Sequence, residues 1–207
     1  MKYFFLLIFW IPLLSFSQIN AITEDGYQIQ LFDDGTWNYV DTTLNEKRFI
    51  KKNDSIFKVP YNSTLNISSS VLDINIMLND KDWLVNPSVE EDITEFLFTH
   101  KNAEIFGILI PEKNAIPVEN LRNIALINAR DNVENLTILE EEYRQVNNLK
   151  VLYLCFEGEV EKMKLRYNNY FYSGEDGIAQ LITYARKDVA IRNKDAIFKL
   201  LNGLIKK

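Results

Sequence analysis

Four strand-like segments near the C-terminal end of the chain, joined by very short connections, restrict the possible folds more than any other feature. They are rich in β-branched and aromatic residues and cover 137–146, 149–158, 163–173 and 178–185. The connections between them are Asn147-Asn148, 159–162 and 174–177. Because such short connections join neighbouring strands of opposite direction, the pattern predicts an antiparallel meander.

Two segments with helical periodicity lie before and after this meander. Pro117 suits a first helical turn, and apolar residues then follow at three- and four-residue spacing to about Arg130. A second apolar stripe begins near Asn193 and comprises Ile197, Leu200, Leu201 and Leu204. The sheet needs its apolar surface covered, and these two helices are the available covers.

The remaining elements complete an α+β prediction: an antiparallel meander flanked by two or more helices and preceded by a short β-hairpin. Segments 94–98 and 103–110 flank a polar turn at His100-Lys101-Asn102, which predicts a second hairpin. Shorter strands are expected at 56–59 and 71–78, separated by a Ser/Asn-rich stretch at 62–70. We therefore place one α+β domain at 55–207.

The N-terminal part of the chain predicts a smaller hairpin module. Alternating segments at 27–32 and 36–40 surround Asp33-Asp34-Gly35, and Asp-Gly suits the positive φ angles of a tight turn. Trp37 and Tyr39 fall on one face of this hairpin. We expect them to hold the hairpin on the main domain, or else to form part of an interaction surface. Residues 18–54 are thus assigned to the hairpin and a linker, or short surface helix, at 41–54.

The first 17 residues have the order of a signal peptide. Lys2 precedes an apolar run at 4–14, and Ser15-Phe16-Ser17 supplies small residues for a cut before Gln18. The run has 11 residues, whereas a transmembrane anchor needs about 20. A lipid anchor needs a cysteine after the cut, and the only cysteine is Cys155. The mature protein is expected to be free, periplasmic or secreted.

Charge and cysteine content exclude several classes of protein. Removal of the leader deletes Lys2 and no acidic residue, so the net charge moves from −6 to −7. The nearest approach to a basic cluster is the Lys206-Lys207 tail, a dipeptide, which argues against binding of nucleic acid, and the acidic balance disfavours anionic membrane surfaces. A single cysteine forms no internal disulfide, so the core must hold the fold.

Residues with potential for chemistry all have an ordinary structural explanation. Cys155 lies in an apolar strand and His100 in a polar turn, so we expect a buried thiol and an exposed imidazole rather than a catalytic pair. Glu141 should face away from Glu140 and Glu142 on a strand, at a solvated strand end. Asp33-Asp34 and Glu175-Asp176 precede glycines and are typical of turns rather than calcium loops. No catalytic residue, cofactor site or metal site is assigned.

The aromatic segment around Tyr170 is the other candidate for a binding surface. Strand alternation places Tyr167 and Phe171 on one face and Tyr170 and Tyr172 on the other. One pair is expected in the core and the other partly exposed. We assign Tyr170 and Tyr172, with Trp37 and Tyr39, as candidate interaction residues. The alternative for the Tyr170 segment is ordinary packing under a helix.

Segment 148–185 (NLKVLYLCFEGEVEKMKLRYNNYFYSGEDGIAQLITYA), the earlier FLFTHKNAEIFGILIPEK hairpin and the helix after Pro117 together resemble the PsbP-like fold family. This family includes PsbP, the Ran-binding protein Mog and periplasmic DcrB-type proteins. Separately, DGYQIQLFDDGTWNYV resembles a DGTW module of exported bacterial proteins. Because PsbP-like proteins act chiefly by binding other proteins, the resemblance implies an accessory role rather than an enzyme.

The sequence therefore favours an exported, non-enzymatic accessory protein that binds another protein of the cell envelope. One alternative is a small-ligand or lipid binder with a pocket between the sheet and the C-terminal helix. A second alternative is a hydrolase with an unrecognised site.

Overall fold

The computed structural model describes residues 19–23, 28–32, 35–39, 50–88 and 94–207. The chain divides into two compact units, Met1–Glu46 and Lys47–Lys207. The first unit contains strands β1 (Ile19–Ile22), β2 (Gln28–Leu31) and β3 (Trp37–Tyr39) in one antiparallel sheet. The predicted hairpin corresponds to β2 and β3, and β1 is an additional strand. The predicted signal peptide lies outside the described residues.

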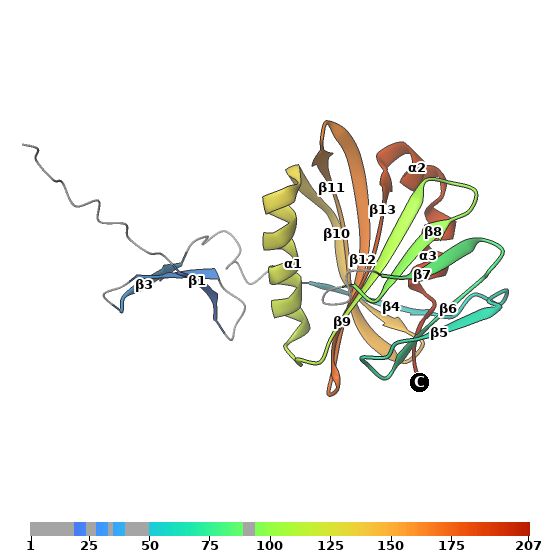
Figure 1. The fold of residues 1–207 in the computed structure, drawn as a ribbon, viewed down its shortest axis with the longest axis horizontal. Coiled ribbons are helices and arrows are strands. Elements are labelled where there is room, and N and C mark those ends of the chain that lie inside the picture. The colour runs from blue at the N-terminus through green and yellow to red at the C-terminus, as the bar shows by residue number, and fades with distance from the viewer. Residues whose placement is uncertain (1–18, 24–27, 33–34, 40–49, 89–93) are drawn as a thin grey trace, which may run out of the picture. The chain divides into compact units, whose positions relative to one another are not determined.

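An eight-stranded sheet forms the centre of the main domain (Figure 1). Its order is β4-β10-β11-β12-β13-β9-β8-β7. The strands are β4 (Lys51–Phe57), β7 (Trp83–Pro87), β8 (Phe96–His100), β9 (Ile105–Glu112), β10 (Glu134–Val146), β11 (Leu149–Val160), β12 (Met163–Gly174) and β13 (Gly177–Arg186). The predicted meander is confirmed as β10 to β13, and among the strand pairs of this sheet within the described residues only β4–β10 is parallel.

Two of the meander turns have the same tight geometry. Asn147 and Asn148 both have positive φ angles, 48° and 69°, and Val146 pairs with Leu149 across the turn. Glu161 and Lys162 behave in the same way, with φ of 50° and 68°. Two consecutive residues with positive φ define a turn whose twist matches that of the flanking strands. These turns fix the register of β10, β11 and β12.

One face of the sheet is partly covered by helix α1 (Val118–Asn132), which begins after Pro117 as predicted. Leu121 and Leu126 are 1% and 0% exposed and pack in a cluster with Leu152, Leu154 and Phe171 of β11 and β12. Helix α1 contacts β10, β11 and β12. The helix therefore covers the part of this face that β10, β11 and β12 form.

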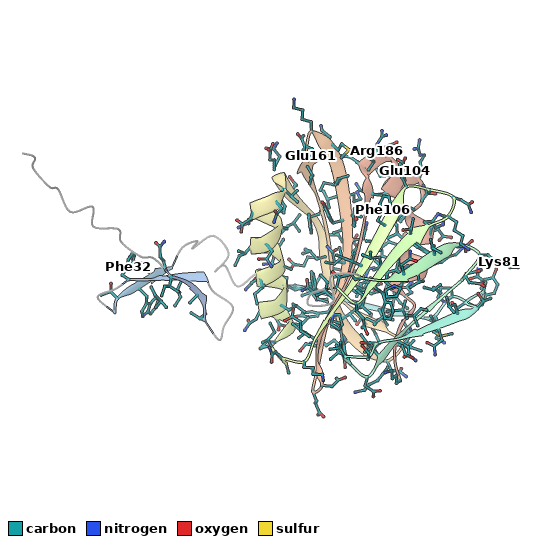
Figure 2. The ribbon with its side chains drawn as sticks, in the orientation of Figure 1. Phe32, Lys81, Glu104, Phe106, Glu161 and Arg186 are labelled. Carbon is teal, nitrogen blue, oxygen red and sulfur yellow. The ribbon has the colours of Figure 1, made fainter. Side chains whose placement is uncertain are left out.

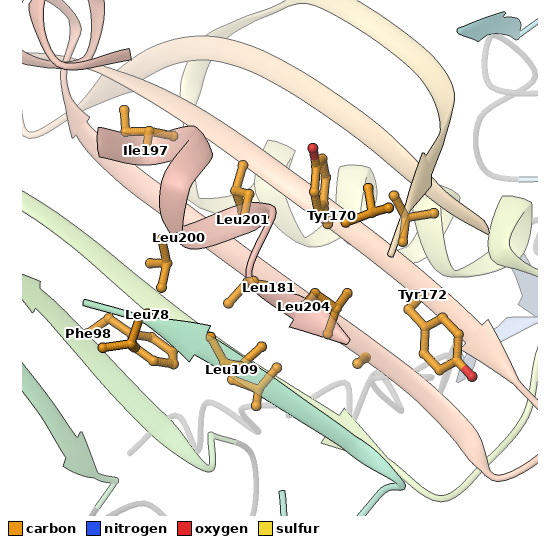
Figure 3. Packing of buried hydrophobic residues seen from close by; sticks show 14 of the residues in the cluster. Leu78, Phe98, Leu109, Tyr170, Tyr172, Leu181, Ile197, Leu200, Leu201 and Leu204 are labelled. Carbon is orange, nitrogen blue, oxygen red and sulfur yellow. The ribbon is translucent and has the colours of Figure 1, made fainter. Parts of the chain in front are cut away.

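The opposite face carries the main core. Helices α2 (Lys187–Arg192) and α3 (Lys194–Leu201) pack there with a small sheet, β14-β6-β5. Its strands are β5 (Leu65–Ser68), β6 (Ile74–Leu78) and β14 (Leu204–Lys206). Figure 3 shows Ile197, Leu200 and Leu201 of α3 among the buried side chains of this cluster. The prediction that the C-terminal helix covers this face of the sheet is confirmed, and the small sheet β14-β6-β5 covers it as well.

Three boundaries differ from the prediction. Residues 51–54, expected in a linker, belong to β4, whose polar side chains are mostly exposed at the edge of the sheet and so resemble a linker in sequence. The Ser/Asn-rich stretch contains β5. The single C-terminal helix is two helices, and Leu204 lies in β14 because the chain turns at Gly203 to pair with β6. The main unit accordingly begins at Lys47 rather than at residue 55.

Candidate functional site

The face covered by α1 extends beyond that helix onto β13, β9, β8 and β7. Directly paired residues of neighbouring strands point to the same face of a sheet. The register therefore places one transverse row on this face, consisting of Phe156, Tyr167, Tyr184, Phe106, Thr99 and Leu84 from β11 to β7. This row leads from beneath α1 out to the edge strand.

Four aromatic rings of this row stack on one another across the strands. The ring centroids of Phe156 and Tyr167 are 4.6 Å apart, those of Tyr167 and Tyr184 6.0 Å, and those of Tyr184 and Phe106 5.5 Å. The interplanar angles are 15°, 29° and 29°. Exposure rises along the row, from 6% at Phe156 to 39% at Phe106. Near-parallel rings in mutual contact stabilise one another, so the row is a rigid apolar feature.

A second row of aliphatic side chains lies beside the aromatic one. Ile182 of β13 pairs with Ile108 of β9, which pairs with Leu97 of β8. Leu97 and Leu84 are 37% and 49% exposed, and the two isoleucines are half-buried. We call the set Leu84, Leu97, Phe106, Ile108, Ile182 and Tyr184 the open face. A contiguous apolar surface of this kind is typical of a site that another molecule covers.

Burial of the tyrosines in the aromatic row affects their ionisation. Burial raises the pKa of Tyr167, with a smaller contribution from Tyr184, and burial alone raises the pKa of Tyr184. Both hydroxyl groups therefore remain neutral at physiological pH. The row presents no ionised group to a partner, so a partner would bind it through apolar contacts.

None of the open-face residues was predicted as a site from the sequence, although β9 carries one signal of a second apolar face. Segment 105–110 (IFGILI) has apolar residues at both its odd and its even positions. Ile105 and Leu109 are 0% and 1% exposed and belong to the main core, whereas Phe106, Ile108 and Ile110 point to the other face. A strand that is apolar on both faces requires two covers.

The prediction that Tyr170 and Tyr172 form an exposed pair is wrong. They are 0% and 5% exposed and lie in the main core, as Figure 3 shows. Alternation correctly separated them from Tyr167 and Phe171, but their face of β12 lies in the layer with α3 and the small sheet. The Tyr170 hydroxyl donates a hydrogen bond to Asn202 Oδ1 at 2.8 Å. Their role is therefore in packing.

The other two predicted interaction residues belong to the N-terminal unit. Trp37 is 49% exposed on β3. The side chain of Tyr39 lies outside the described residues, although its backbone belongs to β3. A role of Trp37 and Tyr39 in binding or in holding the hairpin on the main domain stays a prediction.

Cys155 and His100 lie on β11 and β8, which are separated by β12, β13 and β9. Four strand spacings of about 4.8 Å place them roughly 19 Å apart. Cys155 is 4% exposed, as predicted, and burial raises its pKa. His100 is half-buried and packs edge-on against Trp83 with ring centroids 5.0 Å apart, so the prediction of an exposed imidazole is wrong. The two residues do not form a catalytic pair.

The acidic run Glu140-Glu141-Glu142 holds structural ion pairs. Glu141 faces α1 and binds Arg122, with Nε and Oε1 2.6 Å apart. Glu142 points to the opposite face and binds Arg144 at 2.6 Å. The predicted separation of Glu141 from Glu142 is confirmed, but the prediction of a solvated strand end is wrong, because both pairs are largely buried. Neither carboxylate is free to act as an acid or base.

The turn at Glu175-Asp176 is confirmed. The Asp176 carboxylate accepts a hydrogen bond from the backbone N–H of Asp73 at 2.8 Å, and Gly177 has a φ of 139°. Within the part of the chain that the structure describes, no group of three His, Cys, Asp or Glu residues is arranged to hold a metal ion. Asp33-Asp34 lies outside the described residues.

The space expected to form a ligand pocket between the sheet and the C-terminal helix is filled with side chains. Ile197, Leu200 and Leu201 are between 0% and 1% exposed and pack in the main core with Leu181 and Leu109. This packing does not favour the small-ligand alternative at that position. Among the helices in the described ranges, none combines the length and apolar character needed to cross a membrane.

Comparisons with known proteins identify the fold. No family model and no curated protein matches the sequence. Among solved structures, cyanobacterial PsbP from Synechocystis aligns with a TM-score of 0.52 and 10% identity over 72% of this chain and 95% of its own. A putative regulator of unknown function from Pseudomonas aeruginosa aligns at 0.47 and 10% identity, over 69% and 96% of the two chains.

A third solved structure is LpqN, involved in cell envelope biogenesis of Mycobacterium tuberculosis, with a TM-score of 0.46 and 12% identity over 81% of this chain and 97% of its own. Identities this low are informative about fold alone. The main domain thus has a PsbP-like α+β fold, which confirms the resemblance seen in the sequence. The comparisons do not test the DGTW module.

Proposed function

We propose that this chain is a non-enzymatic accessory protein of the bacterial cell envelope that binds another protein through the open face. The observation that best supports this proposal is the apolar surface of β13, β9, β8 and β7. On this surface Leu84, Leu97 and Phe106 are 37% to 49% exposed. Exposed apolar area of this extent is unfavourable in water, and its burial is the main driving force of protein association. Export through residues 1–17 places the protein in the envelope.

The stacked rings favour a protein partner over a carbohydrate. A sugar ring binds best on the free flat face of an aromatic side chain, but Tyr167 and Tyr184 have ring faces in contact with their neighbours. Phe106 and the aliphatic Leu84 and Leu97 are the most exposed side chains of the open face, and they suit the apolar side chains of another protein. Cys155 is far from His100, and Glu141 and Glu142 are held in ion pairs, so neither of these two clusters supports the hydrolase alternative.

Replacing Phe106 by Glu is expected to reduce partner binding at least tenfold, because it places a charge in the middle of the open face. A loss of affinity of this size is typical when an aromatic residue at the centre of an interface is removed. Mature protein from Gln18 onward serves as bait in a crosslinking pull-down from solubilised envelope of the native host, with quantification by mass spectrometry.

Ile56→Glu is the matched control for this experiment. Ile56 is 67% exposed on β4, at the opposite edge of the sheet from β7. We expect wild type and Ile56→Glu to recover the same partner in equal amounts, with unchanged circular dichroism in both variants. Equal recovery by Phe106→Glu would exclude the open face as the binding site, and an empty wild-type pull-down would contradict the proposed function.

A further inference from the structure

A groove lies between the β11–β12 turn and the beginning of α2, at the end of the domain that carries Glu161 and Arg186 in Figure 2. Its volume is about 610 Å³. Four basic side chains line it, Lys162, Lys164, Arg186 and Lys187, together with Asp188, Met163 and Ile191. The volume lies within the range of roughly 300–1,000 Å³ that is typical of small-molecule sites.

The groove carries a surplus of positive charge on an acidic protein. Asp188 is shared by Arg186 at 3.5 Å and Arg192 at 2.8 Å. Glu157 is likewise shared by Lys187 and Arg166. Asp188 and Glu157 thus neutralise only part of the charge of Arg186 and Lys187, since each is shared with an arginine outside the groove. The whole chain has a net charge of −6, so this local excess of cations is a departure from its average surface.

Lys164 adds to this surplus. Its Nζ lies 3.9 Å from Glu159, at the limit of an ion pair, and its side chain is 71% exposed. A pair this exposed and this long contributes little, so the Lys164 ammonium is available to a ligand. Lys164 also lines a smaller adjoining depression of about 190 Å³ with Glu157 and Lys187. Lys164 and Lys187 line both depressions, and Glu157 and Glu159 also line the smaller one.

The groove also has apolar surface beside its charged side chains. Met163 and Ile191 are 48% and 50% exposed within it, although both are large hydrophobic side chains. The methylene stems of Lys162 and Lys164 extend the apolar surface, because long basic side chains present apolar stems below their charged ends. An inorganic anion would use only the charges, and a neutral alkyl chain only the apolar part. A ligand that uses both has an anionic head joined to an alkyl chain.

We propose that this groove binds a single-chain amphiphile that ends in a carboxylate, as a fatty acid does. The carboxylate lies between Lys164 and the Arg186–Lys187 pair, and the alkyl chain packs against Met163 and Ile191. This site is distinct from the interface of α3 with the sheet, which side chains fill. The inference does not depend on partner binding at the open face.

The test is a fluorescence titration of the mature protein with 11-(dansylamino)undecanoate, a fluorescent alkyl carboxylate. We expect saturable binding with a blue shift of the dansyl emission. The methyl ester of the same probe lacks the charge and is expected to bind at least tenfold more weakly. The double variant Lys164→Glu/Arg186→Glu should likewise weaken binding of the carboxylate at least tenfold, and Ile191→Ser should weaken both probes.

The matched control is Lys81→Glu/Lys113→Glu, which makes the same change of charge at exposed sites outside the groove. Equal affinity of acid and ester, or equal affinity of the groove variant and this control, would overturn the proposal. A third arm measures sedimentation with phosphatidylcholine vesicles containing phosphatidylglycerol. Binding to vesicles without binding of the monomeric probe would also overturn it, in favour of a membrane surface.

Discussion

Replacement of Glu142 by Gln is expected to lower the free energy of unfolding by about 3 kcal/mol, because it removes the closest and only buried counter-ion of a buried arginine. The side chains of Glu142 and Arg144 are 4% and 6% exposed, and the two groups are 2.6 Å apart. The Arg144 guanidinium also lies 3.6 Å from the centroid of the Tyr153 ring and 4.8 Å from that of Phe57. These contacts compensate part of its burial but do not neutralise it.

Urea unfolding of the mature protein, followed by far-UV circular dichroism, measures this loss. Glu140→Gln is the control, since Glu140 is 48% exposed and 3.5 Å from Arg144, and a change below about 0.5 kcal/mol is expected. The double variant Glu142→Gln/Arg144→Met should lose less than the two single variants together, because it removes the unpaired charge. A Glu142→Gln protein as stable as the control would contradict the structural role of this pair.

The same pair predicts a dependence of stability on pH. Burial acts to raise the pKa of Glu142, but the hydrogen bonds from Asn53 and Arg144 outweigh it, so the pKa is lowered from its ordinary value of 4.5. A lowered pKa in the folded state means that the contribution is present above about pH 4.5 and is lost as the pH falls through the lowered value. The stability difference between wild type and Glu142→Gln should therefore shrink below pH 4.5.

Gly203→Ala is the second substitution with a large expected effect. A Cβ atom at this position would lie 2.0 Å from the Met77 carbonyl oxygen, which is a backbone atom and cannot move aside alone. The Gly203 carbonyl accepts a hydrogen bond from the Met77 N–H at 2.8 Å, next to the pairing of β14 with β6. Separation of these strands would expose part of the main core, so we expect a loss of about 3 kcal/mol.

Gly107→Ala is the matched control for Gly203→Ala. Its Cβ would lie 3.1 Å from Leu200 Cδ2, the end of a side chain that can shift by a few tenths of an ångström. We expect a loss of about 1 kcal/mol in the same urea experiment. If Gly203→Ala were no more destabilising than Gly107→Ala, the close contact between the α3–β14 turn and β6 would be contradicted.

Local signals made the meander and its neighbours predictable from the sequence. Two-residue connections such as Asn147-Asn148 leave one possible pairing of their strands, and the helix after Pro117 follows from a fixed φ angle and regular apolar spacing. The first part of β4, residues 51–54, was missed because only one side of this strand is paired, so most of its side chains remain polar and exposed. Its pairing with β10 joins residues about 90 apart in sequence, and no local pattern encodes it.

The candidate site could not be predicted in the same way. Alternation showed that Tyr170 and Tyr172 share a face, but it does not show whether a distant element covers that face. The cover is formed by α3 and by strands from both ends of the main domain, so the exposed aromatic pair proved to be buried. The open face joins residues of β7, β8, β9 and β13, and its continuity depends on the strand order rather than on any single segment.

The most direct test of the open face as a protein-binding surface is site-specific photocrosslinking in the native host, with p-benzoylphenylalanine in place of Leu97 or, as a control, of Tyr61. Leu97 is 37% exposed in the open face, and Tyr61 is fully exposed outside it. We expect the Leu97 position to form a crosslink to one envelope protein and the Tyr61 position to form none. A crosslink to the same protein from Tyr61, or none from Leu97, would contradict binding through the open face.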